Sequence, residues 1–395
     1  MVIGARAYEF ARVTVGVVGV VVLAACGTMT RNAVPESASI NEVVAAPGVI
    51  RFWGDAVPKD IEARLRRIDA QNRAAGINPS GVINYLALSG GGSDGAFGAG
   101  LLVGWSAAGT RPKFDLVTGV STGSLIAPFA FLGSSHDEEL KQVFTAYSAN
   151  DIARRRSLLD IPVEASIADD APLAHLIEHY VTPDFVATIA DEHRKGRRLL
   201  IGTTNLDAQR PVIWNMGEIA ARGDQSSIEL FRKVLRASAS IPGIFPPVLI
   251  SVEQDGKMYD EMHVDGGVAA QVFIFPTRLD PRLVDKQLGV APTRRLFIVR
   301  NGRLNPVWET VQPELLKIAG RSISSLIKYQ GRGDLNSMYL QSRSYGVDYN
   351  LASIPVSFSD REKEPFDHDY MNALFDTAYD LGRHGYRWRK NPPDF

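Results

Sequence analysis

One serine in this chain stands in a setting that suits nucleophilic chemistry. Ser121 is the middle residue of Gly119-Val120-Ser121-Thr122-Gly123, between the apolar run 114–117 and the apolar, helix-like stretch 125–132. A serine at a tight strand-to-helix turn is typical of a nucleophile elbow, where flanking glycines let the turn close and let substrate approach the hydroxyl. The sequence therefore predicts that Ser121 attacks a carbonyl carbon in an acyl-transfer reaction.

A glycine run upstream of Ser121 suits the second requirement of that chemistry. The apolar residues 85–88 lead into Ser89-Gly90-Gly91-Gly92-Ser93-Asp94-Gly95, and a helical stretch follows. The tetrahedral intermediate of acyl transfer carries an oxyanion that needs preorganised N–H donors. A glycine run offers accessible backbone N–H groups, and the positive end of the following helix adds to them.

The same glycines also fit two phosphate-binding motifs. Gly90, Gly92 and Gly95 match G-x-G-x-x-G, and Asp115 lies at about the distance expected of a ribose-binding acid. That acid should end the second strand, whereas Asp115 begins it, so dinucleotide binding is the weaker interpretation. A structural glycine turn remains an alternative. A P-loop is excluded because no Gly-Lys-Ser/Thr follows.

Composition narrows the class of protein. The chain has 395 residues, 45% of them hydrophobic, and a net charge of −1. This length suffices for one large domain or two smaller ones. Near-neutral charge argues against nucleic-acid binding, so no nucleic-acid partner is expected.

The N-terminus resembles a bacterial lipoprotein signal peptide. A short basic region and the apolar stretch 13–25 end in Leu23-Ala24-Ala25-Cys26-Gly27, where cleavage would leave a lipidated Cys26. Cys26 is the only cysteine, so no intramolecular disulfide can form. We expect a signal peptide over 1–25, a lipidated cysteine and flexible tether over 26–50, and attachment to a membrane in the cell envelope, with the outer membrane favoured. A chance cysteine after an ordinary signal peptide is the alternative.

Hydrophobic periodicity predicts the elements that position the candidate residues. Strands are expected over 84–89, 114–120, 198–204, 211–216, 258–264 and 296–299, with an edge strand over 347–354. Helices are expected over 61–75, 96–108, 226–240 and 369–386. The stretch 313–340 predicts one or two helices, broken near 331–333.

One further motif could bind a metal. His175, Glu178 and His179 fit H-x-x-E-H, and the two histidines would share a helix face. No third ligand is evident, so they are interpreted as ordinary helix residues and no metal or cofactor is expected.

Four blocks in order resemble the patatin-like phospholipase family over about residues 82 to 300. They are Gly90-Gly91-Gly92-x-x-Gly95, Gly119-x-Ser121-x-Gly123, Ala237-Ser238-x-x-Ile241-Pro242-x-x-Phe245-Pro246-Pro247, and Asp265-Gly266-Gly267. The resemblance implies a three-layer α/β/α sandwich with a largely parallel sheet, and a Ser–Asp dyad without histidine or metal. It implies Ser121 as nucleophile, Asp265 as base, an oxyanion hole at Gly91 and Gly92 with Gly90 and Ser93, and a lipid ester substrate.

Two positions depart from that family's pattern. The residue before Gly95 is commonly Arg or Lys, and here it is Asp94. The position after Asp-Gly-Gly that commonly holds Asn is close to Gln271. We expect Asp94 to cap the following helix, since Asp before a helical run is ordinary N-terminal chemistry.

The resemblance also suggests the division of the chain. We expect a helical extension over 51–80, the catalytic core over 81–300, and a helical extension over 301–395 that packs on the core. Two rival functions remain open: a Ser-His-Asp α/β-hydrolase using His368 or His384, and a catalytically silent envelope lipoprotein that only binds. The sequence does not indicate the oligomeric state.

Overall fold

The computed structural model describes residues 31–36, 50–78, 80–155, 166–274 and 280–392. The predicted signal peptide, Cys26 and most of the predicted tether lie outside these residues. Among the helices in the described ranges, none is both long and apolar enough to cross a bilayer.

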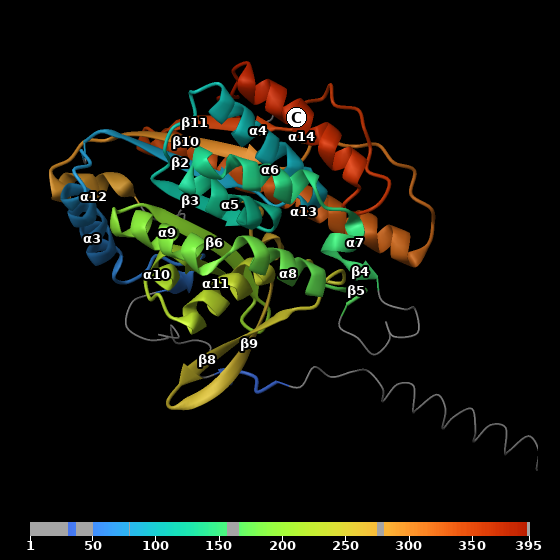
Figure 1. The fold of residues 1–395 in the computed structure, drawn as a ribbon, viewed down its shortest axis with the longest axis horizontal. Coiled ribbons are helices and arrows are strands. Elements are labelled where there is room, and N and C mark those ends of the chain that lie inside the picture. Colours follow the sequence, from blue (N-terminus) through green and yellow to red (C-terminus); the bar gives the residue numbers. More distant parts are fainter. Residues whose placement is uncertain (1–30, 37–49, 79, 156–165, 275–279, 393–395) are drawn as a thin grey trace, which may run out of the picture.

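A nine-stranded mixed sheet forms the centre of the molecule (Figure 1). Its main path runs β1-β7-β6-β3-β2-β10-β11, and β9 pairs with both β6 and β8. The five strands from β6 to β11 on this path are parallel, and the pairings at the β6 side are antiparallel. The strand bounds are β1 (Arg51–Trp53), β2 (Val82–Leu88), β3 (Leu116–Val120), β6 (Arg198–Asn205), β7 (Arg210–Asn215), β8 (Val248–Gln254), β9 (Lys257–Asp265), β10 (Thr293–Arg300) and β11 (Asp348–Ser353).

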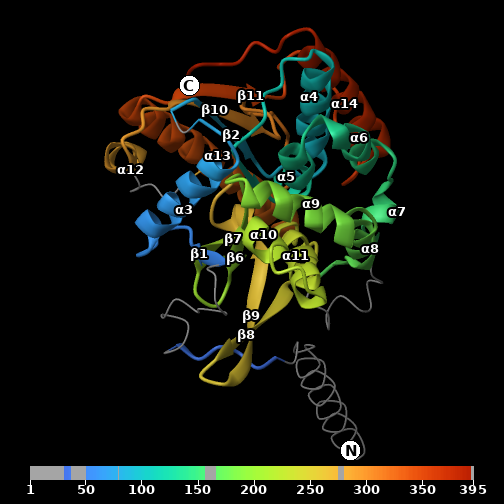
Figure 2. The same cartoon turned by 60° about the vertical axis from the view of Figure 1, so that its left-hand side comes forward.

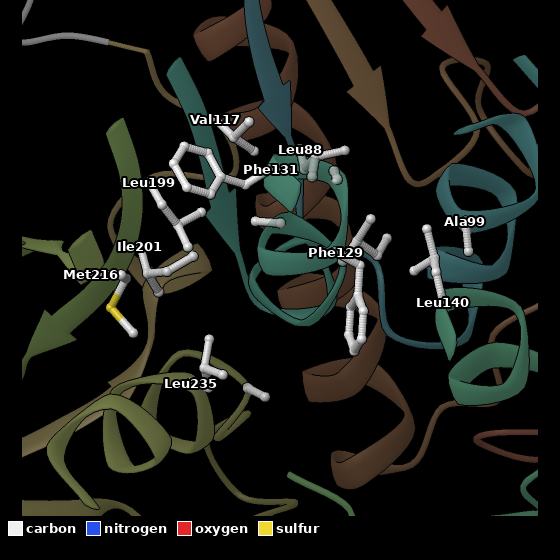
Figure 3. Close-up of a cluster of buried hydrophobic side chains, with 14 of the residues drawn as sticks. Leu88, Ala99, Val117, Phe129, Phe131, Leu140, Leu199, Ile201, Met216 and Leu235 are labelled. Atoms are coloured by element: carbon white, nitrogen blue, oxygen red, sulfur yellow. The ribbon is translucent and has the colours of Figure 1, made fainter. Parts of the chain in front are cut away.

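Alternating side chains of the parallel strands fill two separate cores. On β2, Leu86 and Leu88 belong to the larger core, while Tyr85 and Ala87 belong to the smaller one on the opposite face. Figure 3 shows Leu88, Val117 and Leu199 of the larger core. Because both faces of a parallel sheet must be covered, this alternation requires a helical layer on each side.

Helices supply those two layers (Figure 2). The larger core packs against α4 (Gly95–Ala107), α5 (Thr122–Leu132), α6 (Asp137–Thr145), α8 (Ala171–Tyr180), α9 (Pro183–Arg194), α10 (Met216–Ala220), α11 (Gln225–Ser238) and α14 (His368–Arg383). The opposite side carries α3 (Ile61–Ala74), α12 (Pro281–Leu288) and α13 (Leu315–Tyr345). The short α7 (Ala149–Ile152) and the two-stranded sheet of β4 (Arg154–Arg155) and β5 (Ala168–Asp169) lie beside α8. The expected three-layer α/β/α sandwich with a largely parallel central sheet is therefore confirmed.

The segment after residue 300 is built into this sandwich. Strand β11 extends the parallel sheet beside β10, and α14 packs along α4. The contact between α4 and α14 is close, because a side chain at Gly100 or Gly104 would collide with the backbone of α14. These residues complete the sheet and cover one of its faces.

Two expectations about individual elements were wrong. Helix α13 runs unbroken from Leu315 to Tyr345, because Gly331 is buried against Arg300 and Gln271. Strand β8 was not expected at all. It forms a hairpin with β9 that projects from the body (Figure 1), and its residues alternate between buried and more exposed positions.

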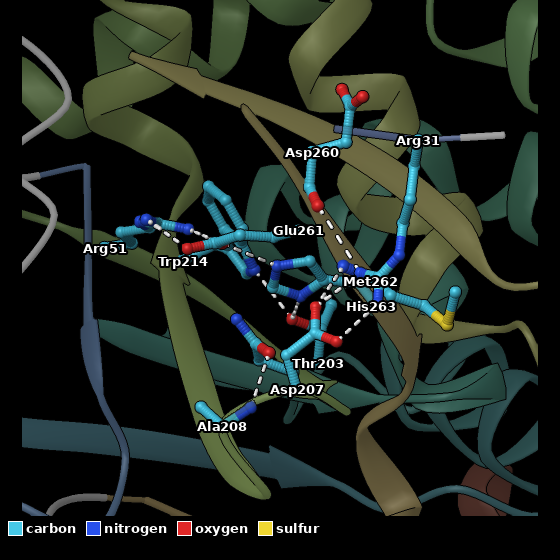
Figure 4. Close-up of polar contacts among 11 residues, drawn as sticks. Arg31, Arg51, Thr203, Asp207, Ala208, Trp214, Asp260, Glu261, Met262 and His263 are labelled. Atoms are coloured by element: carbon cyan, nitrogen blue, oxygen red, sulfur yellow. Dashed lines mark hydrogen bonds and ion pairs between the residues drawn. The ribbon is translucent and has the colours of Figure 1, made fainter. Parts of the chain in front are cut away.

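A buried polar network ties β9 to its neighbours (Figure 4). His263 Nε2 lies 3.0 Å from Glu261 Oε2, and Thr203 Oγ1 lies 2.9 Å from His263 Nδ1. Trp214 Nε1 donates to the same Thr203 oxygen at 2.8 Å, and Arg51 pairs with Glu261. Each buried group thus has a partner, which fixes β9 against β6 and β7.

Candidate active site

The carboxyl ends of neighbouring strands bring the candidate residues together. β2 ends before the glycine run, β3 ends immediately before Ser121, and Asp265 ends β9. Asp265 stands opposite Thr203 on β6, and β6 is the neighbour of β3. Ligands of open α/β sheets bind at this edge, so these residues meet where a site is expected.

Ser121 has the backbone of a nucleophile elbow. Its φ is 54° and its ψ is −129°, a combination that residues other than glycine rarely adopt, and α5 begins at the next residue. Such strain persists only where surrounding contacts hold it, and it is common at functional sites. Ser121 is 6% exposed, and its position at a helix N-terminus places positive partial charge near its hydroxyl.

The motif glycines are explained by close backbone contacts. A Cβ at Gly119 would lie 2.4 Å from the Gly123 oxygen, and one at Gly123 would lie 2.5 Å from the Leu88 oxygen. Gly266 approaches the Gly202 oxygen in the same way, at 2.4 Å. Any side chain at these three positions would push apart the strands that carry Ser121 and Asp265.

Asp265 is a buried carboxylate with incomplete hydrogen bonding. Its Oδ1 accepts from the Gly267 N–H at 2.7 Å, whereas its buried Oδ2 has no partner that meets hydrogen-bond geometry among the described residues. Burial raises the pKa of Asp265 to about 7, although the Ser121 hydroxyl facing the carboxylate and the Gly267 N–H act to lower it. A carboxylate beside a serine hydroxyl, with a pKa near neutrality, is suited to accept that hydroxyl's proton.

One turn after α11 holds both residues in place. The Ser121 N–H donates to Ser238 Oγ at 3.0 Å, and Ser238 Oγ donates to the Gly202 oxygen at 2.7 Å. Two residues later, the Ser240 oxygen accepts from the Asp265 N–H at 2.9 Å. The sequence motif at Ala237-Ser238 was noted for its resemblance alone, and its structural role in positioning Ser121 and Asp265 was missed.

The glycine run partly matches the expected oxyanion hole. The Gly90 N–H donates to the Gln271 oxygen at 3.2 Å, so Gly90 is not available as an oxyanion donor, contrary to expectation. Its role is close packing, since a Cβ there would lie 2.9 Å from Ser121 Cβ. No hydrogen bond within the described ranges engages the Gly91 or Gly92 N–H groups, which therefore remain the candidate donors.

Two residues at the end of β10 fix this loop, and sequence reasoning missed both. Arg300 Nη1 donates to the Gly90 oxygen at 2.9 Å, and Asn301 Nδ2 donates to the Ser89 oxygen at 2.7 Å. In a trans peptide the C=O and the next N–H point in opposite directions, so the Arg300 contact turns the Gly91 N–H away from itself. Polar residues directly after a buried strand were the available signal.

Ser93 and Asp94 face the C-terminal segment. Ser93 Oγ donates to Glu362 and accepts from the Phe366 N–H at 2.9 Å. Asp94 makes no side-chain cap, so the expected cap on α4 is wrong. Its Oδ1 instead accepts from the Tyr370 hydroxyl at 2.5 Å. Burial raises the pKa of Asp94, opposed by the Tyr370 hydroxyl and by nearby arginines. Asp94 has an αR backbone, not the extended conformation of most capping residues, which explains the missing cap.

An apolar pocket opens beside Ser121. Its cavity volume is about 90 Å³. Its walls come from α5, α6, α8 and α11, together with Phe366 and Met371. Gly92, Ser121 and Thr122 form the polar end, so the rest of the pocket is suited to a hydrocarbon chain.

The residues of the rival interpretations lie elsewhere. His368 Nε2 contacts the Thr145 oxygen, and His384 contacts its own helix, so neither pairs with Ser121 or Asp265. Asp115 accepts from the Asn84 N–H at the amino ends of the strands, away from the glycine run. His175 and His179 are exposed on α8, and within the described part of the chain no cluster of three metal-ligating side chains exists.

A serine on a nucleophile elbow, a facing carboxylate and a hydrocarbon-lined pocket on an α/β sandwich define a serine acyl hydrolase site. Residues 86–277 match the family model described as patatin-like phospholipase, so this part of the chain is similar to that family. Comparison with curated protein sequences gave no match.

Two solved structures show a distant likeness. VipD from Legionella pneumophila has 10% identity and a TM-score of 0.33 over 76% of this chain. Human GIVD cytosolic phospholipase A2 has 10% identity and a TM-score of 0.31 over 78% of this chain. The matches span 66% and 55% of those chains, less than two thirds of each.

Proposed function

We propose that the protein hydrolyses carboxylic ester bonds of lipids, as a phospholipase A or lysophospholipase, through Ser121 and Asp265 and without a cofactor. The observation that carries this proposal is the buried Asp265 carboxylate beside the Ser121 hydroxyl. Its Oδ2 has no hydrogen-bond partner of good geometry among the described residues, and burial raises its pKa to about 7. A carboxylate kept for structural reasons alone would be expected to have its oxygens paired.

In the proposed reaction, Asp265 accepts the Ser121 proton as Oγ attacks the ester carbonyl carbon. The carbonyl oxygen becomes the oxyanion, and the Gly91 and Gly92 N–H groups stabilise it, assisted by the N-terminus of α5. Asp265 then returns the proton to the leaving alcohol, which departs as the C–O bond breaks and leaves an acyl-enzyme. Water, activated by the same carboxylate, attacks this ester and releases the fatty acid and free Ser121.

The pocket suggests where the acyl chain lies. Its apolar walls begin at Ser121 and are formed by residues such as Leu125, Phe129, Leu176 and Leu235. Placing the acyl chain there leaves the alcohol part of the lipid toward the solvent side, near Gly92. Apolar burial of the chain would then hold the carbonyl next to Oγ.

The test is hydrolysis of a phospholipid and of a soluble aryl ester by the purified protein. Ser121→Ala should remove both activities while the protein stays folded, and a fluorophosphonate should label wild type at Ser121. Ser135→Ala is the matched control, because Ser135 is an exposed serine on a different turn. Labelling or activity that survives Ser121→Ala would refute the proposal, and a fully active Asp265→Asn enzyme that requires His368 or His384 would restore the triad alternative.

We also propose that Cys26 carries the lipid anchor that holds the enzyme at a membrane of the cell envelope. The support is the sequence Leu23-Ala24-Ala25-Cys26 after a short apolar stretch. Cys26→Ser should abolish palmitate labelling and move the protein from the membrane fraction, or leave it unprocessed. Palmitate incorporation that persists in Cys26→Ser would contradict this.

A further inference from the structure

The N-terminal half of α13 carries large apolar side chains that no described residue covers. Leu315 is 82% exposed, Leu326 is 70% exposed, and Trp308 in the preceding loop is 86% exposed. Isolated exposed apolar residues are ordinary on protein surfaces, but a contiguous group usually marks an interaction surface. Figure 1 shows this orange half of the helix running out past the ends of the strands.

Apolar and charged residues occupy opposite sides of this half-helix. We define its apolar face as Leu315, Ile318, Ile323, Leu326 and Ile327, all more than a third exposed. The other side carries only cations: Lys317, Arg321, Lys328 and Arg332, with no acidic residue between Glu314 and Asp334. An amphipathic helix with a basic polar side is typical of segments that lie in the surface of an anionic bilayer.

Residues on the basic side bond to the loop before α13, whereas the apolar face is directed outward. Lys328 Nζ donates to the Asn305 oxygen at 2.7 Å, and Arg321 Nη1 pairs with Glu309 at 3.0 Å. Both partners belong to the loop before α13, the loop that also presents Trp308. These contacts hold the loop on the charged side of the helix, and the apolar face is exposed among the described residues.

The other half of α13 connects this face to the active site. Leu335 and Met338 are buried in the smaller core, and Gly331 lies against Arg300, the residue that holds the Gly90 carbonyl. Gln330 Nε2 donates to the Val268 oxygen at 3.4 Å, three residues after Asp265. The apolar face therefore belongs to the same continuous helix whose following residues contact the segments that carry the proposed catalytic groups.

We propose that the apolar face of α13 docks the enzyme on an anionic lipid bilayer. This inference rests on the proposed lipid hydrolase function. A bilayer with anionic headgroups fits the charge of this half-helix, because it carries cations and no acidic residue between Glu314 and Asp334. The half-helix is about 24 Å long at 1.5 Å per residue, long enough to lie flat in the interface.

The test places an environment-sensitive fluorophore on the face itself. A Leu326→Cys probe is made in the full chain carrying Cys26→Ser and Ser121→Ala, so that it is the sole cysteine and no lipid is hydrolysed. Phosphatidylglycerol vesicles should shift its emission to the blue, and brominated lipid should quench it at least threefold. The response should fall severalfold with phosphatidylcholine vesicles or in 1 M salt, where charges are screened.

Leu283→Cys is the matched control, because Leu283 is a 64% exposed leucine on α12, at the opposite end of the molecule in Figure 1. Its probe should not respond. No response at 326, or an equal response at 283, would overturn the proposal. A probe at 326 that is shielded before vesicles are added would also overturn it, because another segment of the chain would then cover the face. So would an emission shift that grows with protein concentration alone, because that indicates self-association.

A kinetic measurement separates this inference from the proposed function. In the catalytically intact chain, Leu326→Glu should lower the ratio of vesicle hydrolysis to soluble aryl-ester hydrolysis about tenfold, and Leu283→Glu should leave that ratio unchanged. An unchanged ratio in Leu326→Glu would reject the docking surface alone. Wild-type protein that cleaves neither substrate would reject the proposed function, while the fluorescence result would still stand on its own.

Discussion

Strand β9 carries two buried carboxylates, four residues apart, whose surroundings differ in kind. Glu261 is paired with Arg51 and His263, and these partners lower its pKa to about 2 even though burial acts to raise it. Within the described part of the chain Asp265 has no cation beside it, and burial raises its pKa to about 7. Similar depth thus produces opposite charge preferences, and the difference lies in the partners that each carboxylate is given.

This contrast distinguishes Glu261, an acid with a structural role, from Asp265, an acid suited to proton transfer. The Glu261 network satisfies its members and joins β9 to β6 and β7 (Figure 4). Among the described residues, the buried Oδ2 of Asp265 has no hydrogen-bond partner of good geometry, and it lies next to the strained Ser121. A protein gains stability from the first arrangement and loses some at the second, which is the usual relation between a scaffold and the reactive group that it holds.

The largest expected effect is on kcat/KM, when the Asp265 carboxylate is replaced by an amide and the same change at Glu261 is compared with it. Asp265→Asn should lower kcat/KM by about three to four orders of magnitude, because a proposed base acting on its nucleophile is lost. Glu261→Gln, the matched change four residues away, should keep kcat/KM of the folded enzyme within about fivefold. Steady-state kinetics with a soluble ester measure both, and the reverse ranking would mean that the roles assigned to the two acids are exchanged.

The pH dependence should have opposite signs at the two residues. Asp265 has a folded pKa of about 7 against an unfolded value of about 3.9, so its ionisation should destabilise the fold progressively from pH 4 to 7, by up to about 4 kcal/mol. Glu261 should stabilise the fold above pH 4.3, and that contribution should be lost as pH falls toward 2.

Two profiles check these signs. The kcat/KM profile should rise through a pKa near 7, as Asp265 loses its proton. Urea titrations from pH 4 to 8 should show that Asp265→Asn flattens the decline in stability. A rate profile without a limb near 7, with normal folding, would show that Asp265 does not act as the base.

A loss of stability is expected at the paired acid. Glu261→Gln should lower the free energy of unfolding by about 3 kcal/mol, because Arg51 and His263 lose the charge of a nearly buried partner. Asp265→Asn should leave stability unchanged or higher at pH 8. Denaturant midpoints at constant m-value measure the effect, and equal losses in the two variants would remove the distinction between them.

A smaller effect is expected at the turn that joins the two regions. Ser238→Ala removes the acceptor of the Ser121 N–H and should lower kcat about 10- to 100-fold with little change in KM, because the nucleophile is displaced. Ser240→Ala is the control, since Ser240 contacts Asp265 through its backbone oxygen. A change confined to KM, or an equal loss in Ser240→Ala, would contradict a positioning role for the Ser238 hydroxyl.

The smallest effect concerns a third carboxylate, Asp94, which has a single hydroxyl partner. Asp94→Asn and Tyr370→Phe should each cost about 1 kcal/mol of stability, and the double variant should cost less than their sum. Neither change should raise the rate. A clear rate gain in Asp94→Asn would show instead that this carboxylate opposes the developing oxyanion.

The sequence predicted the parts of the site that depend on local backbone. Ser121 and its glycines could be identified because a strand-to-helix turn requires small residues at fixed spacing, and the order of strands and helices followed from hydrophobic periodicity. Asp265 was assigned by resemblance, since no local pattern reveals which strand ends beside Ser121.

Contacts between distant segments could not be predicted in this way. Gly90 donates to Gln271, and Asp94 accepts from Tyr370, far along the chain. The incorrect oxyanion donor and the incorrect cap both arose because local chemistry was taken as sufficient where tertiary partners competed. The break in α13 was wrong for the same reason, since burial of Gly331 compensates for its low helix propensity.

The contacts of Arg300 and Asn301 limit how far the chain could be shortened without disturbing the candidate active site. Both residues lie beyond the segment 86–277 that matches the family model, yet they hold the loop that contains Gly91. Strand β11 and helix α14 lie further on still, and they complete the sheet and cover α4. A fragment ending at 277 would therefore contain Ser121 and Asp265 without the groups that shape the loop beside them. A truncation that keeps this loop and the sheet intact should therefore place its C-terminal breakpoint after α14, well past the segment that matches the family model.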